Sequence, residues 1–183
     1  MGTNLGNWLN PEGYMFKFSK TNSPRFINEM FCQLVGPDFT AEFWKAFKDN
    51  YITREDIQFI KNTGANTIRL PFHYKLFTDE DFMGLTAGQD GFARVDSVVE
   101  WCREADLYLI LDMHDAPGGQ TGDNIDDSYG YPWLFESEAS QQLYCDIWRK
   151  IADRYKNEPV ILGYELFNEP IACLLYTSPS PRD

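Results

Sequence analysis

The chain has 183 residues, of which 43% are hydrophobic and 16% aromatic, and its formal net charge is −12. This length and composition favour one globular domain over a disordered chain. The negative charge argues against nucleic acid or an anionic membrane surface as a partner, because both would repel the protein. A neutral ligand such as a sugar is compatible with it, and so is a role for the charge in solubility alone.

Cofactor and membrane signals are absent from the sequence. It contains two histidines, His73 and His114, and no C-x-x-C pair. Because no residues have the spacing of zinc ligands, we expect no metal and no other cofactor. No apolar run approaches the roughly 20 residues of a membrane span. Residues 1–6 lack the basic and apolar regions of a signal peptide, so we expect a cytoplasmic chain or a lost N-terminus.

The first third of the chain contains two short strand signals. Residues 2–5 predict a strand, and a long irregular stretch with several prolines follows it. A capping box at residues 53–56 predicts the start of a helix, and Gly64 predicts its end. Residues 65–71 then predict a short buried strand.

The same strand–helix cycle repeats twice more. Apolar residues at helical spacing predict a second and a third helix, each followed by an unbroken apolar strand at residues 107–111 and 160–167. The inner faces of these two helices are Val95, Val98, Val99 and Cys102, and Leu143, Ile147, Ile151 and Tyr155.

Alternating strands and helices with continuous apolar strands predict an α/β fold with a parallel sheet. An open doubly wound sheet that binds a dinucleotide would carry G-x-G-x-x-G after its first strand, and residues 4–8 do not supply it. Polar or ionisable side chains stand at the ends of three successive predicted strands, and barrel enzymes form their active sites from residues in such positions. We therefore predict a (β/α)8 TIM barrel.

The number of predicted strands is half that of a complete barrel, which needs about 250 residues. Residues 173–183 alternate proline with serine near their end, cannot continue a helix, and resemble a translated sequencing adapter. We expect a barrel truncated to roughly its first four βα units. Residues 1–172 would be its N-terminal half, and residues 173–183 an artefactual tail.

Glu169 is the leading catalytic candidate. It follows the last predicted strand, where partial desolvation favours a protonated carboxyl group of the kind that glycoside hydrolysis requires as general acid. Asn168 beside it can hold a sugar hydroxyl. Both reach the same site only if the strand ends or bulges before them, and Pro170 favours an end. The alternative is a glutamate that caps the next helix.

Arg69 and His114 are the other polar residues at predicted strand ends. Arg69 can hold a carboxylate in its ionised form, or it forms a purely structural ion pair. His114 can bond a sugar hydroxyl or a carboxylate, or it is a satisfied core histidine. We expect His73 to serve packing or to lie in a loop.

The polar loop at residues 115–128 contains several acidic residues but lacks the alternating order of calcium ligands, which disfavours calcium. Tyr129, Tyr131 and Trp133 follow it as an aromatic cluster. Such rings can stack on sugar faces or pack the loop on the barrel.

Four segments of the chain resemble glycoside hydrolase family 5, the cellulase-like branch of retaining barrel glycosidases, over residues 2 to about 172. They are residues 4–9, 68–72, 111–118 and 166–170. The resemblance implies that Glu169 is the acid/base and that Asn168 binds the sugar 2-hydroxyl. It places Arg69 beside the nucleophile and His114 in the sugar subsite. Residues 8–12 are similar to the exo-glucanase-like branch, whose glutamate, Glu12 here, touches the terminal sugar.

The family's nucleophile, a glutamate on the seventh strand, has no counterpart in this chain. The resemblance implies that the complete parent is a monomeric, secreted or periplasmic retaining β-glycoside hydrolase. Its substrates would be β-glucan-type polysaccharides or oligosaccharides, and the 183-residue chain would be inactive. From the aromatic cluster itself, we expect Trp133 to bind the sugar. A non-catalytic carbohydrate-binding barrel and a sugar-phosphate enzyme of barrel type are the alternatives. Glycan linkage and endo or exo action are not predicted.

Overall fold

The computed structural model describes residues 1–20, 22–80, 82–84, 89–123 and 126–170, so the predicted tail at residues 173–183 lies outside it. Its centre is a parallel sheet of four strands that pair in the order β1-β2-β3-β4. The strands are β1 (Gly2–Asn4), β2 (Thr67–His73), β3 (Tyr108–Asp115) and β4 (Ile161–Glu165).

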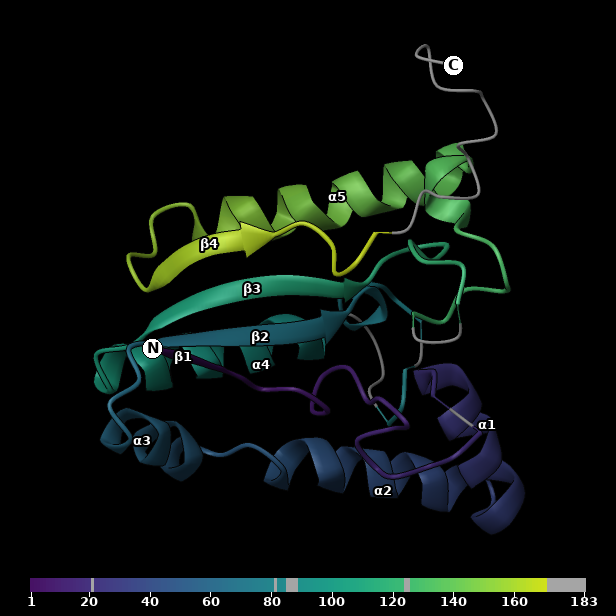
Figure 1. Ribbon diagram of the computed structural model, residues 1–183, viewed down its shortest axis with the longest axis horizontal. Helices are drawn as coiled ribbons and strands as arrows, with labels where there is room; N and C mark the ends of the chain where they lie inside the picture. The colour runs from purple at the N-terminus through teal and green to yellow at the C-terminus, as the bar shows by residue number, and fades with distance from the viewer. Residues whose placement is uncertain (21, 81, 85–88, 124–125, 171–183) are drawn as a thin grey trace, which may run out of the picture.

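The strand order distinguishes the two architectures considered from the sequence. A doubly wound sheet reverses its strand order at a switch point. Here each strand pairs in parallel with the strand that follows it in the sequence, as in a barrel. Figure 1 shows the arrows of β2, β3 and β4 pointing the same way, with α5 (Glu138–Tyr155) on one side of them and α2 (Pro37–Asn50) and α3 (Arg54–Asn62) on the other. The predicted α/β class with a parallel sheet is confirmed.

The connecting helices also follow the prediction. The capping box is present at the start of α3 (Arg54–Asn62), where the Thr53 N–H donates to Asp56 Oδ2 at 2.8 Å. Gly64, with φ of +87°, follows the end of this helix. The predicted apolar stripe of α4 (Gln89–Glu104) is buried. The predicted apolar stripe of α5 (Glu138–Tyr155) is buried from Ile147 onward. The structure also contains short 3-10 helices at Tyr74–Phe77 and Trp133–Phe135.

The stretch expected to be irregular contains two helices instead. They are α1 (Pro24–Val35) and α2 (Pro37–Asn50). Each proline stands in the first turn, where a missing N–H breaks no helical hydrogen bond, so it begins a helix rather than interrupting one. Ser23 caps α1 by accepting a hydrogen bond from the Phe26 N–H. Figure 1 shows α1 beside the carboxyl ends of the strands.

The two faces of the sheet differ in chemistry. Ile68, Leu70 and Phe72 of β2 are fully buried, as are alternate residues of β3, and they form the core under the helices. The residues between them, including Arg69 and Asp112, belong to the opposite face. The prediction that Arg69 ends its strand is wrong by several residues, because β2 continues through Pro71 to His73.

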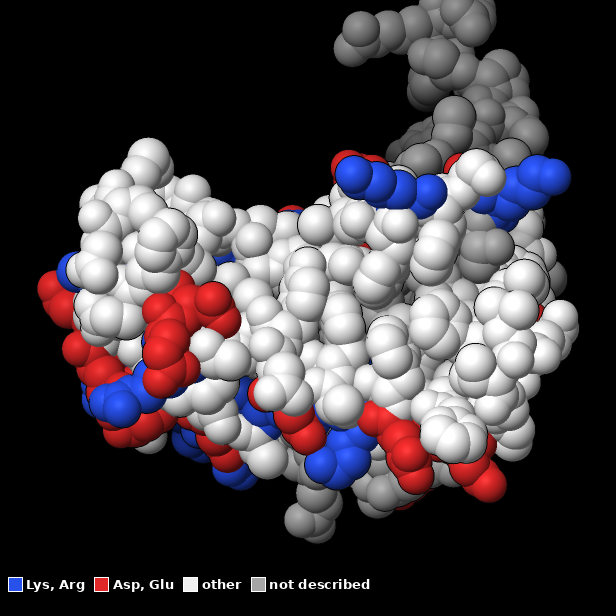
Figure 2. Space-filling view, turned by 90° about the horizontal axis from the view of Figure 1, so that it is seen from below, with Lys and Arg blue, Asp and Glu red and all other residues white. Residues whose placement is uncertain are grey.

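The outer surface of α1 and α2 is unusually apolar. Figure 2 shows a broad uncharged area there, with the charged side chains gathered mainly at its margins. Its exposed residues include Phe26, Met30, Leu34, Phe39 and Phe43. Within the described part of the chain, none of the helices combines the length and hydrophobicity that crossing a bilayer requires.

Candidate active site

Arg69 is the centre of a charged network on the polar face of the sheet. Its Nε and Nη2 atoms donate to the two carboxylate oxygens of Glu165, each at 2.7 Å. Its Nη2 also lies 2.9 Å from Asp112 Oδ2. The hydrogen bond from Arg69 lowers the pKa of Glu165, and Glu165 in turn raises the pKa of Arg69. The guanidinium therefore joins β2, β3 and β4 and keeps Glu165 ionised.

Asp112 is fully buried and serves both Arg69 and His114. Its Oδ2 lies 2.7 Å from His114 Nδ1. Burial raises the pKa of Asp112, while the hydrogen bond from His114 and the positive charges nearby offset part of that shift. Two cations beside a buried carboxylate offset part of the cost of burying its charge.

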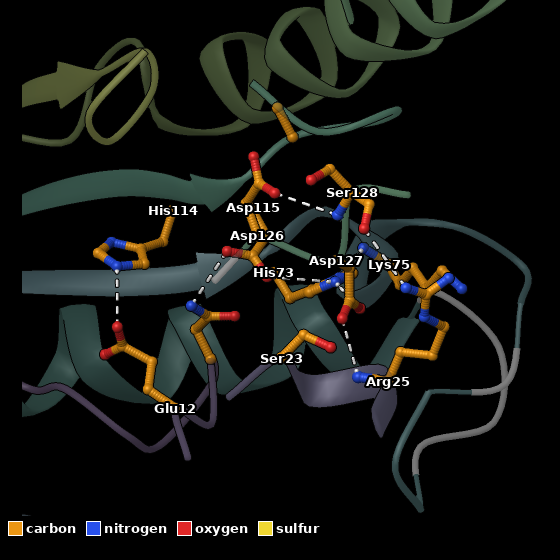
Figure 3. Close-up of polar contacts among 12 residues, drawn as sticks. Glu12, Ser23, Arg25, His73, Lys75, His114, Asp115, Asp126, Asp127 and Ser128 are labelled. Atoms are coloured by element: carbon orange, nitrogen blue, oxygen red, sulfur yellow. Dashed lines mark hydrogen bonds and ion pairs between the residues drawn. The ribbon is translucent and has the colours of Figure 1, made fainter. Parts of the chain in front are cut away.

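His114 stands between two carboxylates. Its Nε2 is 3.6 Å from Glu12 Oε1, and Figure 3 shows the ring and this carboxylate facing each other. Burial lowers the pKa of His114, but the hydrogen bonds to Asp112 and Glu12 outweigh it and raise the pKa to about 10. The ring is therefore an imidazolium at neutral pH. The structure brings together the predicted residues Arg69, His114, Glu12 and Asn168.

Asn168 is tied to this network by its side chain, since its Oδ1 accepts a hydrogen bond from Arg69 Nη2 at 3.1 Å. The strand β4 ends at Glu165, which confirms that residues 168 and 169 lie beyond the regular strand. Glu169 has φ of +44°, in the left-handed region that residues with side chains seldom adopt.

The expectation that Glu169 is desolvated is wrong for this chain, because its side chain is exposed. The physical reason is its position after β4, which is an edge of the sheet formed by the described residues. Its charge nevertheless reaches the site. Burial is the largest cause that raises the pKa of Tyr14, and the nearby carboxylates of Glu12 and Glu169 add to the shift.

Trp133 is 47% exposed and stands on the loop after β3. Its ring centroid is 4.8 Å from that of Tyr131, and the backbone N–H of Trp133 donates to Gly118 O at 3.1 Å. Within the described residues, these contacts are separate from the Arg69 network. Trp133 is thus a solvent-accessible ring on the same edge of the sheet, without a direct link to the charged centre.

His73 is buried, as expected of a packing residue, but its partners are polar. Its Nε2 lies 2.9 Å from Asp127 Oδ2 and 3.5 Å from Asp115 Oδ2, a grouping that suggests a cation site. However, the Lys75 N–H donates to His73 Nδ1 at 3.2 Å, so the proton of the neutral ring is on Nε2. A nitrogen that keeps its proton cannot ligate a metal. Burial lowers the pKa of His73, which keeps the ring neutral.

The His73 group instead fastens a loop. Asp127 Oδ1 accepts a hydrogen bond from the Arg25 N–H at 2.9 Å, at the start of α1 (Figure 3). The loop after β3 is therefore held to both β2 and α1. These contacts hold in place the loop after β3, which carries Trp133.

Sequence reasoning missed four residues of the site. Asp112 and Glu165 were assigned no role, although Asp112 is two residues before His114 and so shares its face of the strand. Asn4, whose Oδ1 accepts from Arg69 Nη1 at 3.3 Å, could have been found in the same way from its place at the end of β1. Gln120 lies in a loop, and no sequence signal marked it.

Comparisons with known proteins identify the family of this chain. The chain matches the model of the family Cellulase (glycosyl hydrolase family 5) over residues 26–173. It is 32% identical over 170 residues to a beta-xylosidase of Phanerodontia chrysosporium, covering 92% of this chain and 35% of that protein. It is 38% identical over 129 residues to endoglucanase C of Acetivibrio thermocellus, covering 70% of this chain and 36% of that one.

A glucan 1,3-beta-glucosidase of Kluyveromyces lactis is 29% identical over 187 residues, covering 95% of this chain and 43% of that protein. The chain thus spans less than half the length of these relatives. Among solved structures, rutinosidase from Aspergillus niger shares the fold with a TM-score of 0.73 at 22% identity, covering 92% of this chain and 48% of the other. Since the family model matches most of its residues, the chain belongs to the cellulase family, glycosyl hydrolase family 5.

Proposed function

We propose that this chain forms part of a retaining β-glycoside hydrolase that acts on β-glucan-type polysaccharides or oligosaccharides, with Glu169 as the acid/base. The observation that carries the proposal is the hydrogen bond from Arg69 to Asn168, the residue directly before Glu169. It ties Glu169 to a charged network at the carboxyl edge of a parallel sheet, where barrel enzymes place their sites. The names of two relatives, an endoglucanase and a glucan 1,3-beta-glucosidase, support the substrate class.

The site residues divide the work of such a reaction. Glu169 gives a proton to the glycosidic oxygen as the bond to the sugar breaks, and later takes a proton from the attacking water. The Oδ1 of Asn168 is held by Arg69, which leaves its amide hydrogens to donate to the sugar 2-hydroxyl. Glu12 and His114 bond other hydroxyls, and Trp133 offers its exposed ring as a stacking surface.

The retaining mechanism also needs a second carboxylate about 5 to 5.5 Å from the first, which attacks the sugar. Glu165 and Asp112 do not suit this role, because both carboxylate oxygens of Glu165 are bound by Arg69 and the side chain of Asp112 is fully buried. We therefore propose that the nucleophile lies outside this chain. On this view residues 1–172 are the first half of a barrel with roughly four βα units, and the 183-residue chain is inactive. We further propose that the full-length enzyme works as a monomer.

To test this proposal, the coding sequence downstream of this chain is determined and the full-length protein is expressed from it. The full-length protein should hydrolyse cellotetraose or laminaritetraose, and Glu169→Gln should abolish that hydrolysis. The 183-residue chain, purified free of host enzymes, should show none. Turnover by this chain that disappears in Glu169→Gln would contradict the proposed missing nucleophile, and a full-length protein without hydrolysis would contradict the enzyme assignment.

A non-catalytic carbohydrate-binding barrel is the second candidate, and the exposure of Glu169 is the observation that favours it. A binding protein needs the aromatic ring and the polar network but no proton donor. It would bind cellotetraose in the full-length form with an affinity that Glu169→Gln leaves unchanged, and it would release no products from any β-glucan.

A further inference from the structure

The side chain of Gln120 is fully buried in the loop after β3, and three hydrogen bonds engage its amide. Its Oε1 accepts from the Ala116 N–H at 3.0 Å. Its Nε2 donates to His114 O at 2.6 Å and to Asn168 O at 3.0 Å. The partners define the orientation of the amide, because the oxygen faces an N–H group and the nitrogen faces two carbonyl groups.

This amide replaces the backbone pairing that β4 no longer makes. The register between β3 and β4 ends at the pair Asp112 and Glu165. Three residues further on, Asn168 has left the strand, and Gln120 links its carbonyl to the carbonyl of His114 on β3. A side chain therefore sets the distance between the end of β3 and the segment that carries Glu169.

Asn168 is consequently held at two separate points. Gln120 binds its backbone carbonyl, and Arg69 binds its side-chain carbonyl at 3.1 Å. Two contacts on different parts of one residue define its orientation, and with it the direction in which the chain leaves toward Glu169. The left-handed backbone of Glu169, with φ of +44°, follows directly after this double contact. Such a conformation persists only where the surroundings hold it.

Gln120 is itself held by a buried carboxylate. Asp126 accepts hydrogen bonds from the backbone N–H groups of Gln120 at 2.7 Å, Thr121 at 2.6 Å and Ser128 at 3.1 Å. Asp126 is 2% exposed, so these bonds are shielded from water. The loop is thus rigid at the residue whose amide reaches across to Asn168.

We propose that Gln120 is the positioning residue that sets the location of the Glu169 carboxyl group. The proposal rests on the proposed function, in which Glu169 protonates the leaving oxygen. A proton donor must stand within hydrogen-bond reach of that oxygen, and a displacement of 1 Å can cost about 100-fold in rate. Gln120 touches no substrate in this role and acts through Asn168.

The experiment uses the full-length protein and two variants. Gln120→Glu keeps the shape and the acceptor for the Ala116 N–H but replaces both donors with an oxygen that faces two carbonyl groups. Gln120→Met keeps the length and removes all three hydrogen bonds. Gln141→Met, at an exposed position on α5, is the matched control.

Two probes separate positioning of the acid from other effects. Cellotetraose or laminaritetraose, whichever the wild type cleaves, has a leaving group that needs a proton. 2,4-Dinitrophenyl β-cellobioside or β-glucoside, matched to that linkage preference, has one that leaves without it. We expect both Gln120 variants to lower kcat/KM by about 100-fold for the oligosaccharide and by less than about threefold for the dinitrophenyl glycoside. The control should change neither.

Each other outcome overturns the inference. Equal losses on both probes, or no loss on either, would show that Gln120 does not position the acid. If both variants lose the native circular dichroism spectrum, the amide serves folding and the proposal fails. Failure of the proposed function itself looks different, because the wild type would then hydrolyse neither probe.

Discussion

Arg69 on β2 donates two hydrogen bonds of 2.7 Å to the carboxylate of Glu165 on β4, across the intervening strand β3. Asp112 of β3 lies 2.9 Å from the same guanidinium. One cation therefore connects three strands on the polar face of the sheet. The arrangement gives the network a structural role, since Asp112 is buried and its side-chain partners are Arg69 and His114.

Replacing Arg69 by methionine should lower the free energy of unfolding by about 3 kcal/mol, because Asp112 would remain buried with one cationic partner instead of two. Urea denaturation at neutral pH measures this loss. Arg103→Met is the control, since Arg103 joins Glu100 and Glu158 on the surface and such pairs contribute little. Equal midpoints for the two variants would contradict the prediction.

His114 should make stability fall as the pH rises. Its pKa is about 10 in the folded protein against an ordinary value of 6.5, so the folded state binds the proton more tightly. The resulting stabilisation is fully present below about pH 6.5 and is lost as the pH rises to about 10. His114→Gln should remove this dependence. The difference in unfolding free energy between wild type and variant should therefore shrink across that window, and a constant difference would contradict it.

Lys48 should act in the opposite direction over a similar range. Burial lowers its pKa from 10.5 to about 7, while its Nζ donates to Met83 O at 2.6 Å. The unfolded chain then binds the proton more tightly, so this group makes stability rise between about pH 7 and 10.5. Relative to wild type, Lys48→Met should gain stability as the pH falls through that window. Urea denaturation at several pH values tests this. If Lys48→Met lost stability relative to wild type as the pH fell toward 7, the prediction would be wrong.

Gly119→Ala should destabilise the loop that carries Gln120. A Cβ atom at Gly119 would lie 2.4 Å from the Cβ of Ser128, and φ is +77°. We expect a loss of about 3 kcal/mol, from backbone strain and overpacking together. Gly64→Ala is the matched control, because its φ is +87° but no atom lies within 4 Å of the added carbon. Its loss should be about 1 kcal/mol, from strain alone. Similar decreases in Tm for the two variants would contradict the predicted steric contribution at Gly119.

Trp133 should contribute to sugar binding through its exposed ring. In the full-length protein carrying Glu169→Gln, Trp133→Ala should weaken binding of cellotetraose or laminaritetraose by up to about tenfold. Tyr108→Ala serves as the control, because Tyr108 is 51% exposed but begins β3 at the opposite end of the strand. Isothermal titration calorimetry gives both affinities. An unchanged affinity in Trp133→Ala would assign this ring to packing of the loop.

Local preference explains which elements were predicted and which were missed. The capping box at Thr53 and the apolar stripe around Val98 act within one or two helical turns, so the sequence displays them directly. Pro24 and Pro37 have two meanings, since a proline both breaks a helix and begins one. The stretch was therefore expected to be irregular, whereas α1 and α2 occupy much of it.

The sequence by itself determined the alternation of strands and helices and placed Arg69, His114 and Asn168 among the residues of one sheet edge. Only the tertiary structure decided their partners: Glu165 is 96 residues from Arg69, and Gln120 is 48 residues from Asn168. Such pairings depend on strand register and on the path of a loop. These arise from packing of the whole sheet, whereas sequence patterns report preferences over only a few neighbouring residues.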